Sequence, residues 1–182
     1  YLPGVASAKL KASYCLTEPT AGSDANSGKT KCVLNPEGTH YLMNGQKMWI
    51  SNARTGDWGL LYAITDREAG HKGMTCFIFN PKETEGVVTS AIETKLGLHC
   101  APTGEIAFDG AKIPKEAVLG EVGQGFPICM WQLNNTRIGC AAGAVGIGGG
   151  ATEAAINYAN ERTQFGKKIG AYQMVQAQIA DM

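Results

Sequence analysis

Residues 14–24 combine side chains that could hold a ligand with a backbone that lets the ligand come close. The segment reads YCLTEPTAGSD, in which Thr17 and Ser23 supply hydroxyl groups and Glu18 supplies a carboxylate. Gly22 lacks a Cβ atom, so a bound molecule could approach the main chain closely beside it. Loops rich in proline, glycine and serine are usually ordinary connections, and the segment alone leaves both interpretations open.

A tryptophan lies in a second unusual strand-like run, residues 48–52, which reads MWISN. Trp49 could belong to the core, which is the commoner fate of tryptophan. It could also form a planar wall for a ring system, with the Ser51 hydroxyl as a hydrogen-bond donor beside it.

Two polar segments in the helical part of the chain could contact a ligand. Residues 162–168 read RTQFGKK, which would suit either a basic helix end or a clamp in which Arg162 binds phosphate and Phe165 stacks on a purine. Residues 134–137 read NNTR and interrupt a small, apolar stretch. They fit a solvated helix face or a helix that crosses a binding cleft.

Residues 146–151, GIGGGA, match the G-x-G-x-x-G/A dinucleotide motif. That motif needs a strand before it, and residues 140–145, CAAGAV, are too small and flexible for a good central strand. No acidic residue follows at the distance that ribose recognition requires. We therefore favour close helix packing over a Rossmann site.

Bulk composition excludes several classes of function. The chain has 182 residues, 16 basic and 16 acidic, so no net charge recruits nucleic acid or an anionic membrane. No apolar run reaches the about 20 residues that span a bilayer, and residues 1–11 lack the apolar region of a secretory signal. Six cysteines without a C-x-x-C pair are interpreted as buried thiols in a reducing compartment. The histidines are scattered, and we expect no metal site.

The pattern of elements changes along the chain. Turn signals separate short strand-like runs over residues 11–123, which predicts a β-barrel or sandwich. Asn44-Gly45 gives the strongest hairpin signal. Helical spacing follows over residues 126–162 and again from Gly170. Because the chain starts without Met and stops inside an amphipathic pattern, we expect it to be part of a longer protein.

These segments, in this order, resemble the acyl-CoA dehydrogenase family. YCLTEPTAGSD is the most specific match, and NGQKMWISN, GEVGQGF and RTQFGKKI support it. The resemblance implies an α+β multidomain fold: the tail of an N-terminal helical domain (1–10), an antiparallel middle β-barrel domain (11–123) and the first helices of an antiparallel C-terminal helical bundle (124–182).

The resemblance also implies FAD as cofactor and an acyl-CoA thioester as substrate. The residues expected to contact FAD come from the loop, the tryptophan strand and the C-terminal segment. They are Tyr14, Cys15, Leu16, Thr17, Gly22, Ser23, Trp49, Ile50, Ser51, Arg162, Gln164, Phe165, Tyr172 and Gln173. The residues expected to contact the CoA substrate are Ser23, Asn134 and Arg137; Asn134 departs from the Asp of some members. Arg162, Gln164 and Phe165 would reach the FAD of a neighbouring subunit.

The same resemblance implies that a glutamate removes the α-proton while the β-hydrogen leaves as hydride to the flavin. A minority of members place this base on the helix before the Arg, where this chain has Thr136. We therefore expect no catalytic base in this chain, a glutamate beyond Met182, and no activity from residues 1–182 alone. Glu18, which precedes Pro19 in a constrained turn, is interpreted as structural.

The resemblance further implies a homotetramer, a dimer of dimers, that passes electrons to an electron-transfer flavoprotein. We expect a cytoplasmic protein, or one of the mitochondrial matrix in a eukaryote, and not a secreted one. Two alternatives stay open. An acyl-CoA oxidase, nitroalkane oxidase or flavin monooxygenase would share the fold, and a non-catalytic binding protein would have lost the base.

Overall fold

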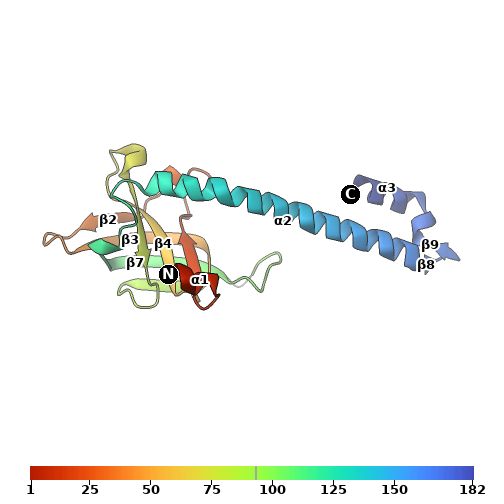
Figure 1. Ribbon diagram of the computed structural model, residues 1–182, viewed down its shortest axis with the longest axis horizontal. Coiled ribbons are helices and arrows are strands. Elements are labelled where there is room, and N and C mark those ends of the chain that lie inside the picture. The colour runs from red at the N-terminus through yellow and green to blue at the C-terminus, as the bar shows by residue number, and fades with distance from the viewer. Residues whose placement is uncertain (93) are drawn as a thin grey trace. The chain divides into compact units, whose positions relative to one another are not determined.

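The computed structural model of the chain describes residues 1–92 and 94–182. The chain divides into two compact units, Tyr1–Met130 and Trp131–Met182. The first unit holds a seven-stranded, curled sheet, and the second holds helices and a small hairpin (Figure 1). The predicted mixture of helices with a barrel-like sheet is therefore confirmed.

The sheet has the strand order β1-β4-β2-β3-β7-β6, and β5 pairs with β4. Its strands are β1 (Ala12–Cys15), β2 (Lys31–Leu34), β3 (His40–Ser51), β4 (Trp58–Ile64), β5 (Met74–Phe79), β6 (Val87–Ala91) and β7 (Thr103–Pro114). The long pairing of β3 with β7 forms the centre of the sheet. Short 3₁₀ turns lie at Ala25–Ser27, Gly70–Gly73 and Lys115–Ala117, and helix α1 covers Leu2–Ala6.

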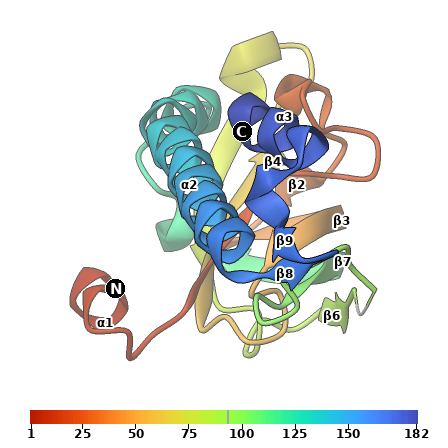
Figure 2. The same cartoon turned by 90° about the vertical axis from the view of Figure 1, so that its right-hand side faces the viewer.

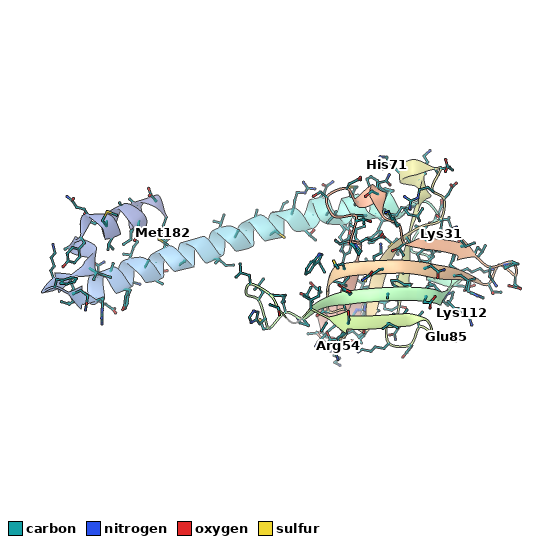
Figure 3. The ribbon with its side chains drawn as sticks, turned by 180° about the vertical axis from the view of Figure 1, so that it is seen from behind. Lys31, Arg54, His71, Glu85, Lys112 and Met182 are labelled. Atoms are coloured by element: carbon teal, nitrogen blue, oxygen red, sulfur yellow. The ribbon has the colours of Figure 1, made fainter. Side chains whose placement is uncertain are left out.

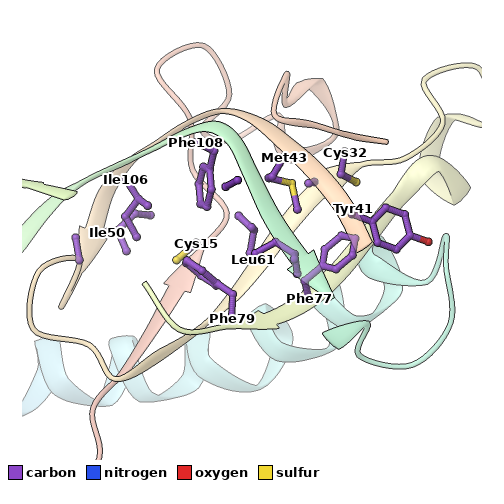
Figure 4. Close-up of a cluster of buried hydrophobic side chains, with 14 residues drawn as sticks. Cys15, Cys32, Tyr41, Met43, Ile50, Leu61, Phe77, Phe79, Ile106 and Phe108 are labelled. Atoms are coloured by element: carbon purple, nitrogen blue, oxygen red, sulfur yellow. The ribbon is translucent and has the colours of Figure 1, made fainter. Parts of the chain in front are cut away.

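Alternation along the strands places every second side chain in one core. Leu61 of β4, Phe77 of β5 and Ile106 of β7 are fully buried there (Figure 4). Burial of a side chain of this size contributes about 1.5–3 kcal/mol. The core thus comes from strands far apart in the sequence, which holds the strand ends in fixed positions.

We expected an antiparallel barrel, but the sheet also contains parallel pairs of strands. Strands β1 and β2 each run parallel to β4, and the other pairings are antiparallel. A parallel pair needs a long connection, and the chain supplies one by passing through β2 and β3 between β1 and β4. β1 therefore ends beside the interior of β4, and the loop that follows it emerges from within the sheet.

The hairpin predicted at Asn44-Gly45 is wrong. β3 continues through both residues, and its register against β7 shifts between Met43 and Gly45. Gly45 has φ +147, and a Cβ atom there would lie 2.6 Å from the main-chain Cα of Thr30. The Asn44 side chain accepts a hydrogen bond of 2.9 Å from the Gly110 amide. Glycine permits a bulge with close main-chain contact here rather than a turn.

All six cysteines are free. Cys15, Cys32, Cys76 and Cys129 are buried, as predicted, whereas Cys100 and Cys140 are exposed, so the prediction of burial is wrong for these two.

Helix α2 (Gly125–Glu161) runs unbroken through Gly148, Gly149 and Gly150. The preceding residues 140–145 are helical, so the dinucleotide-motif interpretation lacks its strand and is rejected. Within the described part of the chain, a Cβ atom at any of the three glycines would meet nothing within 4 Å, so these residues do not form the close packing that we expected. No described helix is both long and apolar enough to cross a membrane.

A two-stranded hairpin joins α2 to α3 (Gln173–Asp181) within the second unit (Figure 2). Its strands are β8 (Thr163–Gln164) and β9 (Lys167–Lys168), followed by a 3₁₀ turn at Ile169–Ala171.

Candidate functional site

The loop after β1 is a tight turn whose side chains face two ways. Leu16 and Glu18 are buried, whereas Gly22 and Ser23 are exposed. Glu18 and Ala21 exchange two main-chain hydrogen bonds of 3.0 and 3.1 Å, which close the turn around Pro19. The loop is therefore anchored by its buried residues, while its tip presents glycine and hydroxyl groups to solvent.

Glu18 provides most of that anchoring. Its carboxylate accepts hydrogen bonds from the Lys29 amide at 2.5 Å and the Thr30 amide at 3.1 and 3.2 Å, and Lys47 Nζ lies 2.7 Å from its Oε1. Burial alone would raise the pKa of Glu18, but the Lys47 ammonium and these hydrogen bonds outweigh it and hold the pKa below its ordinary value. Glu18 is thus structural, as its sequence position predicted.

The other partner of the ion pair is also buried. Lys47 is 2% exposed, and its Nζ donates a second hydrogen bond of 3.0 Å to the Leu16 carbonyl. Burial lowers the pKa of Lys47, whereas the nearby Glu18 carboxylate opposes that effect. We take the pair as charged, because the two backbone amides that donate to Glu18 favour a carboxylate acceptor.

Trp49 stands on a strained part of β3. The register of β3 against β7 shifts again between Lys47 and Ile50, and Trp49 has φ +60. A left-handed backbone is rare for a bulky residue and marks a position that the surroundings impose. Its side chain is 58% exposed, so the core interpretation of this tryptophan is wrong. The bulge turns the indole outward while Ile50 remains buried.

The loop and the bulge lie together. The Met48 amide donates a hydrogen bond of 2.9 Å to the Thr17 carbonyl, and the Asn52 side chain donates one of 3.0 Å to the Ala12 carbonyl. Among the described residues, none hydrogen-bonds to the hydroxyls of Thr17 or Ser51. Free hydroxyls beside an exposed aromatic face match what a flavin ring needs, since its face is apolar and its edge is polar.

Four of the residues expected to contact FAD could do so only through main-chain atoms, because their side chains are buried or already hydrogen-bonded. The side chains of Cys15, Leu16 and Ile50 are buried. The Tyr14 hydroxyl donates to Cys129 Sγ at 3.1 Å, and burial raises the pKa of Tyr14, which keeps that hydroxyl protonated. The side chains of these four residues therefore support the candidate site and do not project into it.

Asn134 and Arg137 lie on α2 and are exposed. Their spacing of three residues puts them on one face of the helix. The Arg137 Nε atom donates to the Leu133 carbonyl at 3.4 Å, which leaves the rest of the guanidinium group available for an anion.

The hairpin of the second unit presents an aromatic side chain at its tip. Phe165 and Gly166 form the two-residue turn with φ +51 and +79, the signs of a type I′ turn. Phe165 is 94% exposed although such a turn prefers asparagine at that position. An exposed aromatic residue on an unfavourable backbone indicates a binding role.

The remaining predicted residues gather around this turn. The Tyr172 hydroxyl donates to the Gln164 carbonyl at 3.0 Å, and the Phe165 and Tyr172 rings are 6.5 Å apart at 85°. Arg162 and Gln173 are exposed beside them. The second unit therefore brings five predicted residues into one small surface, which comprises Arg162, Gln164, Phe165, Tyr172 and Gln173.

Sequence reasoning missed two positions that build the site. Lys47 and Asn52 tie β3 to the loop and to β1. A lysine on the same side of the strand as Tyr41 and Met43, which are buried, was the available signal for Lys47.

Comparison with known proteins gives matches along nearly the whole chain. The model of the acyl-CoA dehydrogenase middle domain matches residues 13–111, and the model of the acyl-CoA dehydrogenase C-terminal domain matches residues 123–182. A glutaryl-CoA dehydrogenase from Desulfococcus multivorans is 45% identical over 182 residues, which are 100% of this chain and 46% of that relative. The chain thus spans less than half the length of this relative.

Solved structures agree with the sequence matches. A glutaryl-coenzyme A dehydrogenase in complex with glutaryl-CoA has a TM-score of 0.92 and 44% identity, over 100% of this chain and 45% of that one. A chain in a structure of the electron transferring flavoprotein of Acidaminococcus fermentans has a TM-score of 0.91 and 40% identity, over 100% of this chain and 47% of that one.

The cofactor is present in a third solved relative. An acyl-CoA dehydrogenase from Bacillus anthracis, solved with FAD, has a TM-score of 0.90 and 40% identity, over 100% of this chain and 31% of that one. Acyl-CoA dehydrogenases are FAD-dependent, and the free hydroxyls and outward indole described above suit that group. The chain belongs to the acyl-CoA dehydrogenase family.

Proposed function

We propose that this chain supplies the flavin-binding surface, and part of the CoA-binding surface, of an FAD-dependent enzyme that converts an acyl-CoA thioester into a 2-enoyl-CoA. The observation that carries the proposal is the meeting of the loop after β1 with the β3 bulge. It places free hydroxyls at Thr17 and Ser51 beside the outward-facing Trp49. Sites of this kind bind a planar ring between an apolar wall and a polar edge.

Most of the predicted residues have a role in this proposal. FAD, when bound, supplies the hydride acceptor. The main chain of residues 14–17 and the hydroxyls of Thr17 and Ser51 hold its ring, and Trp49 covers one face and excludes water. Ser23 contacts both the cofactor and the thioester substrate. Asn134 and Arg137 bind the CoA portion, where the Arg137 charge attracts phosphate.

The second unit completes the site of a neighbouring subunit in this proposal. Arg162 and Gln164 donate hydrogen bonds to the cofactor, and Phe165 packs against it. Tyr172 and Gln173 border the same surface. Such an exchange between subunits fits the homotetramer, a dimer of dimers, that we propose for the full-length protein. Light scattering of that protein should give four chains per particle; a monomer would contradict the shared site.

The proton-abstracting group lies outside this chain in our proposal. Glu18 is the buried carboxylate of residues 14–24, and its ion pair with Lys47 and lowered pKa make it a poor base at neutral pH. We propose a glutamate from residues beyond Met182, so that residues 1–182 alone do not dehydrogenate acyl-CoA. Turnover by that segment with added FAD would contradict this assignment.

The acyl group is best identified by anaerobic bleaching of the flavin absorbance in the full-length protein. Glutaryl-CoA and butyryl-CoA should be included in the panel, together with long, branched and aromatic acyl-CoAs. Bleaching by at least one acyl-CoA supports the dehydrogenase assignment. Absence of bleaching by all of them would favour a non-catalytic binding protein.

The electron acceptor is tested with the same reduced enzyme. We propose an electron-transfer flavoprotein as partner and a cytoplasmic location, or the mitochondrial matrix in a eukaryote. Slow reaction with air and fast reaction with an electron-transfer flavoprotein are expected. Rapid reoxidation by air would instead favour an oxidase or monooxygenase with this fold.

A further inference from the structure

We propose that Lys47 is a positioning residue of the flavin site, and that its buried ion pair with Glu18 sets where Thr17 and Trp49 stand. The inference rests on the proposed function, because it concerns the surface that we assign to FAD. It goes beyond that function by giving a role to two residues that do not face the cofactor.

The ion pair joins three separate pieces of chain at one point. Lys47 Nζ lies 3.0 Å from the Leu16 carbonyl oxygen and 2.7 Å from Glu18 Oε1, which ties β3 to the loop. The Glu18 carboxylate also accepts the amides of Lys29 and Thr30 just before β2. With side chains only 2% and 4% exposed, the pair is shielded from solvent and from salt.

Lys47 also lies at the start of the bulge that turns Trp49 outward. The register shift occurs between Lys47 and Ile50, and within it the Met48 amide bonds to the Thr17 carbonyl at 2.9 Å. The loop and the bulge are therefore joined twice, once by main chain and once by the ammonium group. Removal of the ammonium leaves the Leu16 carbonyl without this donor and the Glu18 carboxylate with only its backbone amide donors, so the side-chain link between β3 and the loop is lost.

An exposed pair between β7 and the loop before β6 serves as a comparison. Lys112 Nζ lies 3.2 Å from Glu85 Oε2, and their side chains are 56% and 81% exposed (Figure 3). Exposed pairs of this kind fix little structure, because water replaces either partner at small cost. Lys112→Met removes the same charge as Lys47→Met and is the matched control.

The experiment compares Lys47→Met, Lys47→Arg and Lys112→Met in the full-length protein. The Kd for FAD is measured with the apoprotein, and the visible absorption and circular dichroism of bound flavin are recorded. We expect Lys47→Met to raise the Kd at least tenfold and to change the flavin spectra. Lys47→Arg, which keeps the charge, should recover part of both, and Lys112→Met should match wild type.

A further control tests whether a loss of stability alone changes the FAD Kd and the flavin spectra. Ile113 is fully buried in β7 and pairs with Tyr41 near the opposite end of β3, so Ile113→Ala destabilises the sheet away from the loop. It should leave the FAD Kd and spectra within twofold of wild type. If Lys47→Met does not fold, Glu18→Gln replaces it, because the amide keeps the shape and removes the charge.

The outcomes separate this inference from the proposed function. A wild-type protein that holds no FAD would overturn both. A wild-type protein that holds FAD, with unchanged Kd and spectra in Lys47→Met or in its substitute Glu18→Gln, would overturn only the role of the ion pair.

Discussion

Replacing Phe165 with asparagine should stabilise the apoprotein and weaken its binding of FAD. Phe165 has φ +51 in the two-residue turn between β8 and β9. The left-handed backbone costs an ordinary L-residue about 1–2 kcal/mol, whereas asparagine tolerates it and is favoured before glycine in this turn type. The substitution therefore relieves strain that the native side chain maintains.

The losses that oppose this gain are small. Phe165 is 94% exposed, so its remaining burial contributes only about 0.3 kcal/mol. Its edge contact with Tyr172, at 6.5 Å between ring centroids, contributes about 0.5 kcal/mol. The expected net effect is a gain of about 0.2–1.2 kcal/mol in the free energy of unfolding of the apoprotein.

The assay is urea unfolding of full-length apoprotein, together with titration of FAD. Gly166→Ala is the control, since Gly166 has φ +79 and a Cβ atom there would meet nothing within 4 Å among the described residues. That change should destabilise by about 1 kcal/mol through the backbone alone. Destabilisation of the apoprotein by Phe165→Asn would refute the argument from strain. An unchanged Kd for FAD would refute the placement of Phe165 against the cofactor.

Three further predictions concern the first unit. The folded pKa of Glu18 is lowered, so the stability that its carboxylate contributes is complete above the ordinary pKa of about 4.3. That stability is lost as pH falls through the folded pKa. The difference in unfolding free energy between wild type and Glu18→Gln should therefore shrink in acid. Equal differences at pH 7 and pH 3 would contradict this. Gly45→Ala should destabilise more than Gly38→Ala, because a Cβ atom at Gly45 lies 2.6 Å from main chain while one at Gly38 meets no described atom within 4 Å; thermal melting of both variants tests this ranking. Burial raises the pKa of Cys15 to about 12, so iodoacetamide at pH 8 should label exposed Cys100 and leave Cys15 unlabelled until the protein is unfolded, as peptide mass mapping would show.

Much of the first unit could be predicted from turn signals and alternation, and the Asn44-Gly45 error shows where that reasoning ends. The dipeptide favours a hairpin locally, but β7 supplies a partner for one continuous strand, and tertiary pairing outweighs turn preference. The register shift there leaves the alternation of β3 unchanged, since Tyr41, Met43 and Lys47 are all buried, and the alternation changes only at the second shift, between Lys47 and Ile50. The outward position of Trp49 beside buried Ile50 could not be predicted without this second shift.

Residue types alone reveal part of the candidate site, and long-range packing decides the rest. The hydroxyls and the exposed aromatic residues are visible as residue types, so the loop and the hairpin tip could be identified. The role of Glu18 could be inferred from its place before Pro19. Its partner could not, because Lys47 reaches it only through long-range packing of β3 against the loop.

The buried position of Lys47 also protects its amine from acylation by a thioester. Thioesters acylate lysine side chains, and the reaction needs an amine with a free electron pair. Burial lowers the pKa of Lys47 and the Glu18 carboxylate opposes that effect, while the 2% exposure of Lys47 keeps reagents away. An enzyme that binds acyl-CoA beside this loop would therefore have an amine within its site architecture that resists covalent self-modification.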